Sequence, residues 1–121
     1  MRKNRRDTNR IVIQKIIRYC NEVEIALNRF NNSFETYQAD FIFRYACDKC
    51  AEQIGELTTR LTDDLKARHE EISWHEIKGL RNIHVHDYES VNFEIMWEIL
   101  TKDIPTLKAQ LEKILAENVT N

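Results

Sequence analysis

The stretch RNIHVHDY, at residues 81–88, gathers side chains that bind anions and transfer protons. An arginine guanidinium binds phosphate with a planar fork and stays charged at any working pH. Histidine titrates near neutrality, and asparagine and tyrosine can hold a ligand or orient a water. These groups together suit phosphodiester chemistry in RNA. A histidine would assist attack by the 2′-hydroxyl or protonate the leaving oxygen, and the arginine would stabilise the developing negative charge.

Helical spacing would bring four of these side chains to one polar edge. At about 100° per residue, Arg81 nearly superimposes on Tyr88, and Asn82 and His86 form a neighbouring column. One such edge is sparse for an active site. Two copies facing each other across a homodimer would make a fuller one, and twofold pairing is the commonest symmetry of soluble oligomers.

A metal site is an alternative use of the same stretch. His84, His86 and Asp87 could act as ligands with His69 or His75. However, His84 and His86 are two residues apart and point to different sides of a helix, unlike the i, i+4 pair of a helical zinc site. We therefore expect no metal and no cofactor.

Two further readings concern hydrolysis and simple helix termination. A nucleophilic hydrolase is not indicated, because the sequence has no G-x-S-x-G elbow and no cysteine beside a histidine. A polar helix end with histidines near its C-terminus would be favoured by the helix dipole. From the residues alone, this structural reading and the reactive site both stay open.

The elements that must position this stretch follow a helical period throughout. The chain has only two glycines and one proline, which is little material for hairpins or a many-stranded sheet. Apolar residues recur at spacings of three and four in a first segment: Ile13, Ile16, Cys20, Val23, Leu27 and Phe30. FNNSFETYQ then interrupts the pattern with turn and cap residues. A second helix is predicted from about Asp40 to His69, with its apolar face at Phe43, Cys47, Cys50, Ile54, Leu57, Leu61 and Leu65.

Glycine and capping residues refine these boundaries. Gly55, inside the second helix, suggests a close helix–helix approach, since an interior glycine costs about 1 kcal/mol against alanine. Ser73 and Glu76 have the spacing of a capping box, so a third helix should begin there and carry RNIHVHDY at its end. A fourth helix should open near Ser90 and kink or restart at Pro105, with Thr101 or Asp103 as the new cap.

These segments predict an all-α protein, an antiparallel up-and-down bundle of four to five helices. At 121 residues the chain fits one domain. The first ten residues carry a charge of +4, which leaves −6 for the remainder of a chain whose net charge is −2. We expect residues 1–9 to form a basic, solvated and partly disordered arm. Contact of this arm with phosphate is the alternative.

The cysteines and the hydropathy indicate a cytoplasmic protein. No segment approaches the roughly 18 apolar residues that span a bilayer, and the sequence has no n-region followed by an apolar h-region to suggest secretion, so no membrane partner is expected. The odd number of cysteines then suggests reduced thiols. CDKC has metal-ligand spacing but stands alone within a helical stretch, so we interpret Cys47 and Cys50 as core residues.

RNIHVHDY also matches the R-x4-H-x-Y signature, and in this it resembles the HEPN-domain ribonuclease toxins of the HepT-like branch. Three further blocks are similar to that branch in the same order: FRYACDKCAEQIGELTTRL to its second helix, ISWHEIKGLRN to its tryptophan-to-RN run, and VNFEIMWEILTKDIPTLKAQL to its closing helices. The likeness covers roughly residues 7 to 117. It implies that residues 1–121 form a single HEPN domain.

The resemblance implies a function as well. Such toxins form homodimers and cleave cellular RNA (tRNA or mRNA) without a metal, at a composite site across the dimer, with the motif arginine and histidine as catalytic residues. Here these are Arg81 and His86. Asn82, directly after the arginine, would support them. His84 falls at a position that is usually variable, and it is either a further supporting group or a solvated bystander.

The family's partner is a minimal nucleotidyltransferase antitoxin (MntA-like), in a type VII-like toxin–antitoxin system. It is thought to silence the toxin by transferring AMP to the motif tyrosine, here Tyr88. The added phosphate would lie beside Arg81 and His86, where RNA phosphate would otherwise bind. The alternative from another class is a non-catalytic helical binding module that scaffolds the nucleotidyltransferase. Its motivation is the acidic body of the chain, which is not an obvious RNA surface.

Overall fold

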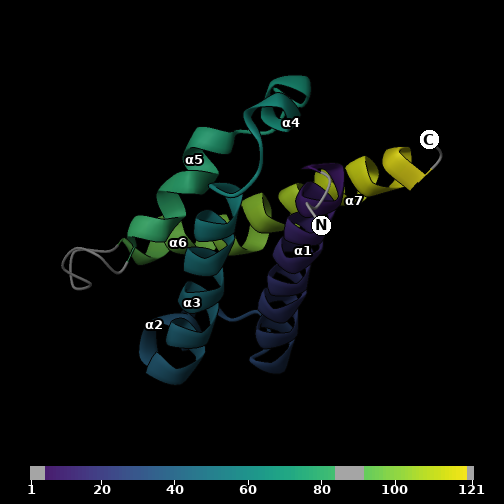
Figure 1. Cartoon of the computed structure of the whole chain (residues 1–121). Coiled ribbons are helices and arrows are strands. Elements are labelled where there is room, and N and C mark those ends of the chain that lie inside the picture. Colours follow the sequence, from purple (N-terminus) through teal and green to yellow (C-terminus); the bar gives the residue numbers. More distant parts are fainter. Residues whose placement is uncertain (1–4, 84–91, 120–121) are drawn as a thin grey trace.

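The computed structural model describes residues 5–83 and 92–119, and the regular structure in these ranges is entirely helical (Figure 1). The prediction of an all-α bundle is therefore confirmed. In chain order the elements are α1 (Arg5–Arg29), α2 (Phe34–Ala39), α3 (Phe41–Thr58), α4 (Asp63–Arg68), α5 (Trp74–Gly79), the 3₁₀ turn η1 (Leu80–Asn82), α6 (Phe93–Glu98), the π-helical segment η3 (Ile99–Asp103) and α7 (Ile104–Val119).

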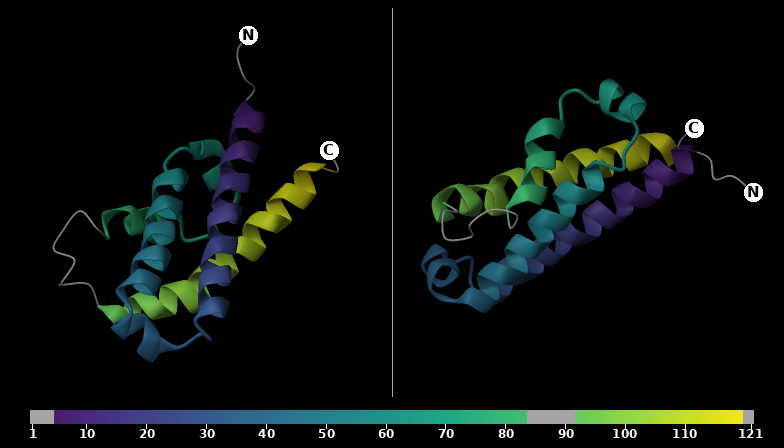
Figure 2. Two further views of the ribbon diagram at one scale, coloured as in Figure 1. Left: turned by 90° about the horizontal axis from the view of Figure 1, so that it is seen from below. Right: turned by 60° about the vertical axis from the view of Figure 1, so that its left-hand side comes forward.

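The antiparallel pair α1 and α3 forms the centre of the bundle. Figure 2 shows these two helices side by side, with the continuous rod of α6, η3 and α7 crossing them and α5 lying over α3. Within the described ranges, no helix combines the length and the apolar character needed to cross a bilayer.

The core is built from the apolar stripes that the sequence predicts. On α1, Ile13, Ile16 and Val23 are at most 1% exposed, and on α3 Phe43 and Ile54 are fully buried. Each such side chain contributes about 1.5–3 kcal/mol on burial. Leu100, Leu107, Leu111 and Ile114 close the core from η3 and α7. Aromatic rings fill the end nearest α2, where Phe30 stacks on Phe43 at 4.4 Å.

The predicted continuous helix from Asp40 to His69 is wrong, because α3 ends at Thr58 and α4 begins at Asp63. Threonine side chains form hydrogen bonds at both sides of this break between α3 and α4. The Thr58 hydroxyl donates to the carbonyl of Gly55 at 2.7 Å, and the Thr62 hydroxyl caps α4 by accepting from the Leu65 amide. Asn9 of α1 holds the turn through two hydrogen bonds to Thr62, of 3.0 and 3.1 Å. Leu57, Leu61 and Leu65 stay buried on both sides of the break, so their spacing did not reveal it.

The segment expected to be only turn and cap residues contains the short helix α2. Asn31 and Asn32 do end α1 in the left-handed region, with φ of 60° and 52°. Ser33 then caps α2, because its side chain accepts from the Thr36 amide at 3.1 Å. Asp40 caps α3 in the same way, through the amides of Ile42 and Phe43. Two caps within eight residues leave room for one short helix between them.

Two capping predictions in the second half of the chain are also corrected. Ser73 does precede α5, but its side chain makes no cap hydrogen bond, so the capping box with Glu76 is absent. The helix was expected to kink or restart at Pro105 with a new cap. The regular α-helix does end at Glu98 and begin again as α7 at Ile104, but without a cap, because the chain between them widens into η3, where the Ile104 amide bonds to the carbonyl of Ile99 five residues earlier. Since proline has no N–H to donate, this π turn absorbs the missing bond without a break.

Neither proposed new cap therefore acts as one. The Thr101 hydroxyl donates to the carbonyl of Trp97 at 2.7 Å, and Asp103 is the last residue of η3. The fourth helix was expected to open near Ser90, which lies outside the described residues. The described α6 is capped by Asn92, whose side chain accepts from the Ile95 amide at 3.0 Å.

Candidate active site

The structure describes only the first three residues of the candidate motif, Arg81, Asn82 and Ile83, which follow α5 and Leu80. The α-helical spacing of α5 ends at Gly79, and Leu80, Arg81 and Asn82 form the tighter turn η1. The α-helical edge on which Arg81 and Asn82 were to stand is therefore not formed at those two residues. His84, His86, Asp87 and Tyr88 lie outside the described residues, so the roles assigned to them remain predictions.

Gly55 fixes the backbone of Arg81. A Cβ built on Gly55 would lie 2.5 Å from the Arg81 nitrogen, 3.0 Å from the Ile77 oxygen and 3.0 Å from the Leu80 carbonyl carbon. Real Cβ atoms do not approach backbone this closely, so only glycine permits α5 and η1 to pack directly on α3. The close helix–helix approach predicted from this interior glycine is confirmed.

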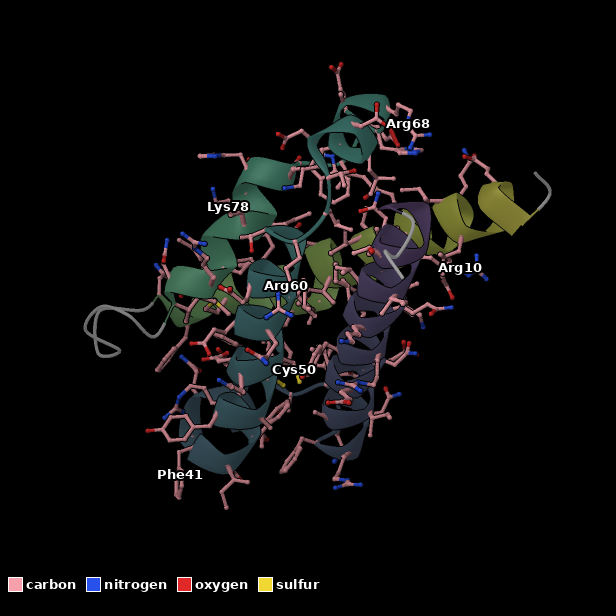
Figure 3. All side chains as sticks on the ribbon, in the orientation of Figure 1. Arg10, Phe41, Cys50, Arg60, Arg68 and Lys78 are labelled. Carbon is pink, nitrogen blue, oxygen red and sulfur yellow. The ribbon has the colours of Figure 1, made fainter. Side chains whose placement is uncertain are left out.

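This packing presents the arginine at the surface of the bundle. Leu80 is 8% exposed and anchors η1 in the core, whereas Arg81 is half-buried and Asn82 is exposed. Lys78, three residues before Arg81 on α5, is also exposed, and Figure 3 shows it on the outer side of that helix. The side chains of Lys78 and Arg81 therefore place two positive charges at the start of the motif.

Phe93, the first residue of α6, follows the motif stretch and is held by a different contact. The Arg44 guanidinium of α3 lies 4.9 Å from the centroid of the Phe93 ring, a cation–π distance. The ring also meets Tyr37 edge-on at 5.8 Å. Arg44 Nη1 in turn donates to the carbonyls of Tyr37 at 3.1 Å and Gln38 at 2.9 Å. The C-terminal end of α2 and the start of α6 are thus joined through one side chain.

A buried polar pair beneath this contact was missed from the sequence. The Tyr37 hydroxyl donates to Asp48 Oδ1 at 2.7 Å, and both residues are fully buried. Asp48 stands between two cysteines, and the sequence analysis assigned it no role. Its spacing of seven residues from Gly55 would have placed it on the same face of α3, and this was the available signal.

A groove of about 370 Å³, lined in part by Leu80, lies between α5 and the residues of α6, η3 and α7. Its floor is aliphatic, and its rim carries Glu71, Glu76 and Asp103. Burial, and then the carboxylates of Glu98 and Glu76, raise the pKa of Asp103 above its ordinary value. This side of the molecule is unfavourable for phosphate, since its rim is acidic.

The cysteines serve the core rather than chemistry. Burial raises the pKa of Cys20 and Cys47 to about 12 and that of Cys50 to about 11. Cys20 and Cys47 are at most 2% exposed, which confirms core packing, while Cys50 is half-buried with its thiol 3.9 Å from Glu22 Oε1. Figure 3 shows Cys50 on the side of α3 that faces α1. Among the described residues, no three His, Cys, Asp or Glu side chains are grouped as metal ligands.

Comparisons with known proteins agree on one family. A family model described as "Ribonuclease HepT-like" matches residues 11–114. The chain is 33% identical over 109 residues to a "Putative RNase" of Caldanaerobacter subterraneus subsp. tengcongensis, covering 89% of this chain and 95% of the relative. It is also 33% identical over 81 residues to a "Probable ribonuclease HepT" of Thermococcus cleftensis, covering 67% and 74% of the two chains.

A further relative, a "Putative RNase" of Methanocaldococcus jannaschii, is 29% identical over 87 residues, 72% of each chain. No solved structure matches significantly. The family model spans most of the described bundle, from residue 11 in α1 to residue 114 in α7, including the Gly55 contact and Arg81. The chain belongs to the HepT-like ribonuclease family.

Proposed function

We propose that this protein is a metal-independent ribonuclease and the toxin of a type VII-like toxin–antitoxin system. The proposal is carried by one combined observation, in which family membership, the motif residues and the packing of the motif's first residue agree. The chain is a HepT-like family member, it keeps Arg81, Asn82, His86 and Tyr88 at the motif positions, and its fold fixes the Arg81 backbone on Gly55.

The proposed reaction is cleavage of a phosphodiester bond in RNA. The 2′-oxygen attacks the adjacent phosphorus, the bond to the 5′-oxygen breaks, and that oxygen leaves with a proton. His86 assists the attack by removing the 2′-hydroxyl proton or supplies the proton to the leaving oxygen. Arg81 binds the phosphate and stabilises its developing charge, and Asn82 orients the substrate. His84 is the further candidate for contact with RNA.

A homodimer would supply the second half of this site. One arginine and one histidine are few groups for both proton transfers, and a twofold pairing of motif segments would bring two sets together. RNA would approach Arg81 and the exposed Lys78 rather than the groove beside α5, because that groove is rimmed by carboxylates. Residues 5–9 belong to α1, so no separate arm of nine residues is formed. The basic side chains of the N-terminal ten residues, Arg2, Lys3, Arg5, Arg6 and Arg10, would add non-specific affinity for tRNA or mRNA, which falls as salt rises.

The proposed partner is a minimal nucleotidyltransferase antitoxin in the same cytoplasm. Transfer of AMP from ATP to the Tyr88 hydroxyl would place a negative phosphate near Arg81 and His86 and compete with RNA for the same cations. An intact mass of protein produced with and without the transferase, next to a Tyr88→Phe variant, tests this regulation.

Purified protein incubated with total RNA in EDTA tests the catalytic proposal. We expect cleavage that survives chelation and is lost in the Arg81→Ala, His86→Ala double variant. His75→Ala is the matched control, since His75 is an exposed histidine on α5 outside the motif. Undiminished cleavage by the double variant would contradict the assignment.

A second candidate function is a non-catalytic helical module that scaffolds the nucleotidyltransferase. The groove rimmed by Glu71, Glu76 and Asp103 favours it, because an acidic, aliphatic surface suits a protein partner better than RNA. This function predicts stable association with the transferase and no effect on RNA at any concentration, which separates it from the ribonuclease.

A further inference from the structure

Two aromatic side chains lie at the surface where α3 begins. Phe41 is 57% exposed and Tyr45 is 51% exposed, whereas every other aromatic residue in the described ranges is buried in the core or packed against it. The two rings meet edge-on, with their centroids 5.6 Å apart and an angle of 65° between their planes. Figure 3 shows Phe41 projecting from the end of α3 that is remote from η1. Together Phe41 and Tyr45 form an open aromatic surface, the ring pair.

An arginine guanidinium lies beside the ring pair. The Cζ atom of Arg44 is 5.6 Å from the centroid of the Tyr45 ring and 4.9 Å from that of Phe93. Its Nη1 donates only to the neutral carbonyls of α2 described above. Within the described ranges, none of the ion pairs includes Arg44. An aromatic ring next to a guanidinium whose charge is not compensated by a carboxylate is a surface that suits a nucleic-acid base and its phosphate.

The ring pair lies on the flank of α3 on which η1 packs. At about 100° per residue, Phe41 is about 40° and Tyr45 about 80° from Gly55 around the helix axis, and the Arg81 backbone packs on Gly55. Tyr45 precedes Gly55 by ten residues, which is about 15 Å along α3. The exposed Ile42 is about 140° from Gly55 and therefore faces elsewhere. A few linked nucleotides span the distance from the ring pair to Arg81.

The charges between the ring pair and Arg81 are compatible with RNA. Glu52 lies on this flank, but Lys49 Nζ pairs with its carboxylate at 2.8 Å, and this hydrogen bond raises the pKa of Lys49. Lys78 is exposed near Arg81. The exposed Glu56 keeps the flank from being strongly basic, so stacking must supply more of the affinity here than charge does. The groove beside α5 lacks both features, because its floor is aliphatic and its rim is acidic.

We propose that the ring pair binds unpaired bases of single-stranded RNA, a few nucleotides from the phosphate held by Arg81. One base stacks on Tyr45 beside the Arg44 guanidinium, and a neighbouring base contacts Phe41. Stacking of this kind tolerates any sequence, because every base has a π face. It selects single strands and loops, since the bases of a duplex are stacked and paired with one another. The inference deepens the proposed ribonuclease function and rests on it for the role of Arg81.

Binding of an RNA that cannot be cut tests the ring pair directly. The probe is fluorescein-labelled 2′-O-methyl oligoadenylate of about twelve nucleotides, which lacks the 2′-hydroxyl that the proposed reaction needs. By fluorescence anisotropy, Tyr45→Ala and Phe41→Ala should each raise Kd by about 5- to 100-fold. Tyr45→Phe keeps the ring and should bind like the wild type. Wild-type protein that does not bind the probe, or a Tyr45→Ala variant with the wild-type Kd, would overturn the proposal.

Ile25→Ala is the matched control, because Ile25 is an apolar residue of α1 with the same 57% exposure as Phe41. It should leave Kd unchanged. Since both rings of the pair are more than half exposed, their truncation should also leave the fold intact, which circular dichroism checks. An Ile25→Ala variant that bound as weakly as Phe41→Ala would show a general loss of apolar surface and overturn the specific role of the rings.

Salt and strandedness separate stacking from attraction of charge. Tyr45→Ala should weaken binding at every salt concentration and leave the slope of log affinity against log salt unchanged. Lys78→Ala should reduce that slope by about 0.7, the value for one phosphate contact on a single strand. A 2′-O-methyl duplex of the same length should bind equally to the wild type and to Tyr45→Ala. A loss in Tyr45→Ala as large for the duplex as for the single strand would overturn the recognition of unpaired bases.

Two further outcomes separate this proposal from its neighbours. If the rings instead joined two copies of the chain, Tyr45→Ala would weaken the dimer in sedimentation velocity and leave the affinity for the probe unchanged, which would overturn the RNA assignment. Wild-type protein that binds the probe through Tyr45 but leaves unmodified RNA uncut would remove the proposed ribonuclease function and support the ring pair as a site for single-stranded RNA.

Discussion

The backbone nitrogen of Arg81 rests directly on Gly55, so closely that a Cβ on the glycine would lie 2.5 Å from it. The contact joins two segments whose sequence separation gives no local reason for them to meet. It links a core position to the proposed phosphate-binding arginine, so a change of one methyl group in α3 should be measurable in RNA cleavage.

Gly55→Ala should therefore reduce both stability and activity. The added methyl meets backbone rather than a flexible side chain, so α5 and η1 must shift, and overpacking of this kind costs about 1–3 kcal/mol. Denaturant unfolding measures the loss, and the cleavage rate at a temperature where the variant is folded measures the displacement of Arg81.

Gly79→Ala is the matched control, because a Cβ at Gly79 has nothing within 4 Å. It lies in the last turn of α5 and should be neutral or stabilise the protein by up to about 1 kcal/mol through helix propensity. Equal effects of the two glycine substitutions would contradict the role of the Gly55 contact.

Tyr37→Phe should destabilise the fold through the buried Tyr37–Asp48 pair. Removal of the hydroxyl takes from Asp48 a donor at 2.7 Å in a fully buried position, and a lost buried hydrogen bond costs about 1–3 kcal/mol. Urea unfolding of Tyr37→Phe and of the half-buried Tyr19→Phe measures this difference. A Tyr37→Phe variant as stable as the Tyr19→Phe variant would show that the pair contributes nothing net.

Asp103→Asn should stabilise the protein at neutral pH and not in acid. Burial, Glu98 and Glu76 raise the pKa of Asp103 in the folded state, so folding favours its protonated form. That contribution to the free energy of unfolding is present below the ordinary pKa of 3.8 and is lost as the pH rises through the raised value.

The expected gain at pH 7 is a few tenths of a kcal/mol, roughly the size of exposed charge interactions. Thermal unfolding from pH 3 to pH 7 measures it. Asp64→Asn is the control with the opposite sign, because Asp64 pairs with Arg68 at 3.3 Å in the first turn of α4. A stability difference for Asp103→Asn that did not change with pH would rule out titration of this carboxyl as its cause.

Much of the helical architecture follows from apolar spacing. The stripe Ile13, Ile16, Cys20, Val23 and Leu27 is buried as predicted, and Gly55 makes the close contact that its interior position suggested. The break between α3 and α4 was not predictable from that spacing, because Leu57, Leu61 and Leu65 continue in register across it. The break depends on side-chain hydrogen bonds of Asn9 and Thr62, which lie 53 residues apart.

The polar part of the site was less predictable for the same reason. Arg81 and Asn82 can be recognised in the sequence as part of a motif, but Arg44 and Asp48 resemble the charged residues of any solvated helix. Their roles arise from contacts with Tyr37 and Phe93, and no local pattern encodes the position of Phe93 over Arg44. The 3₁₀ turn at Arg81 likewise lies where η1 packs on Gly55, a long-range contact that no local pattern encodes.

The pH dependence of kcat for RNA cleavage in EDTA tests the central claim most directly. A histidine that transfers the proton should give the wild-type rate a limb with a pKa near that of histidine, and His75→Ala should keep both the limb and the rate. His86→Ala should lose at least about 100-fold in kcat, in line with the usual contribution of a general acid or base. A His86→Ala variant with the wild-type rate and the wild-type pH profile would contradict the account.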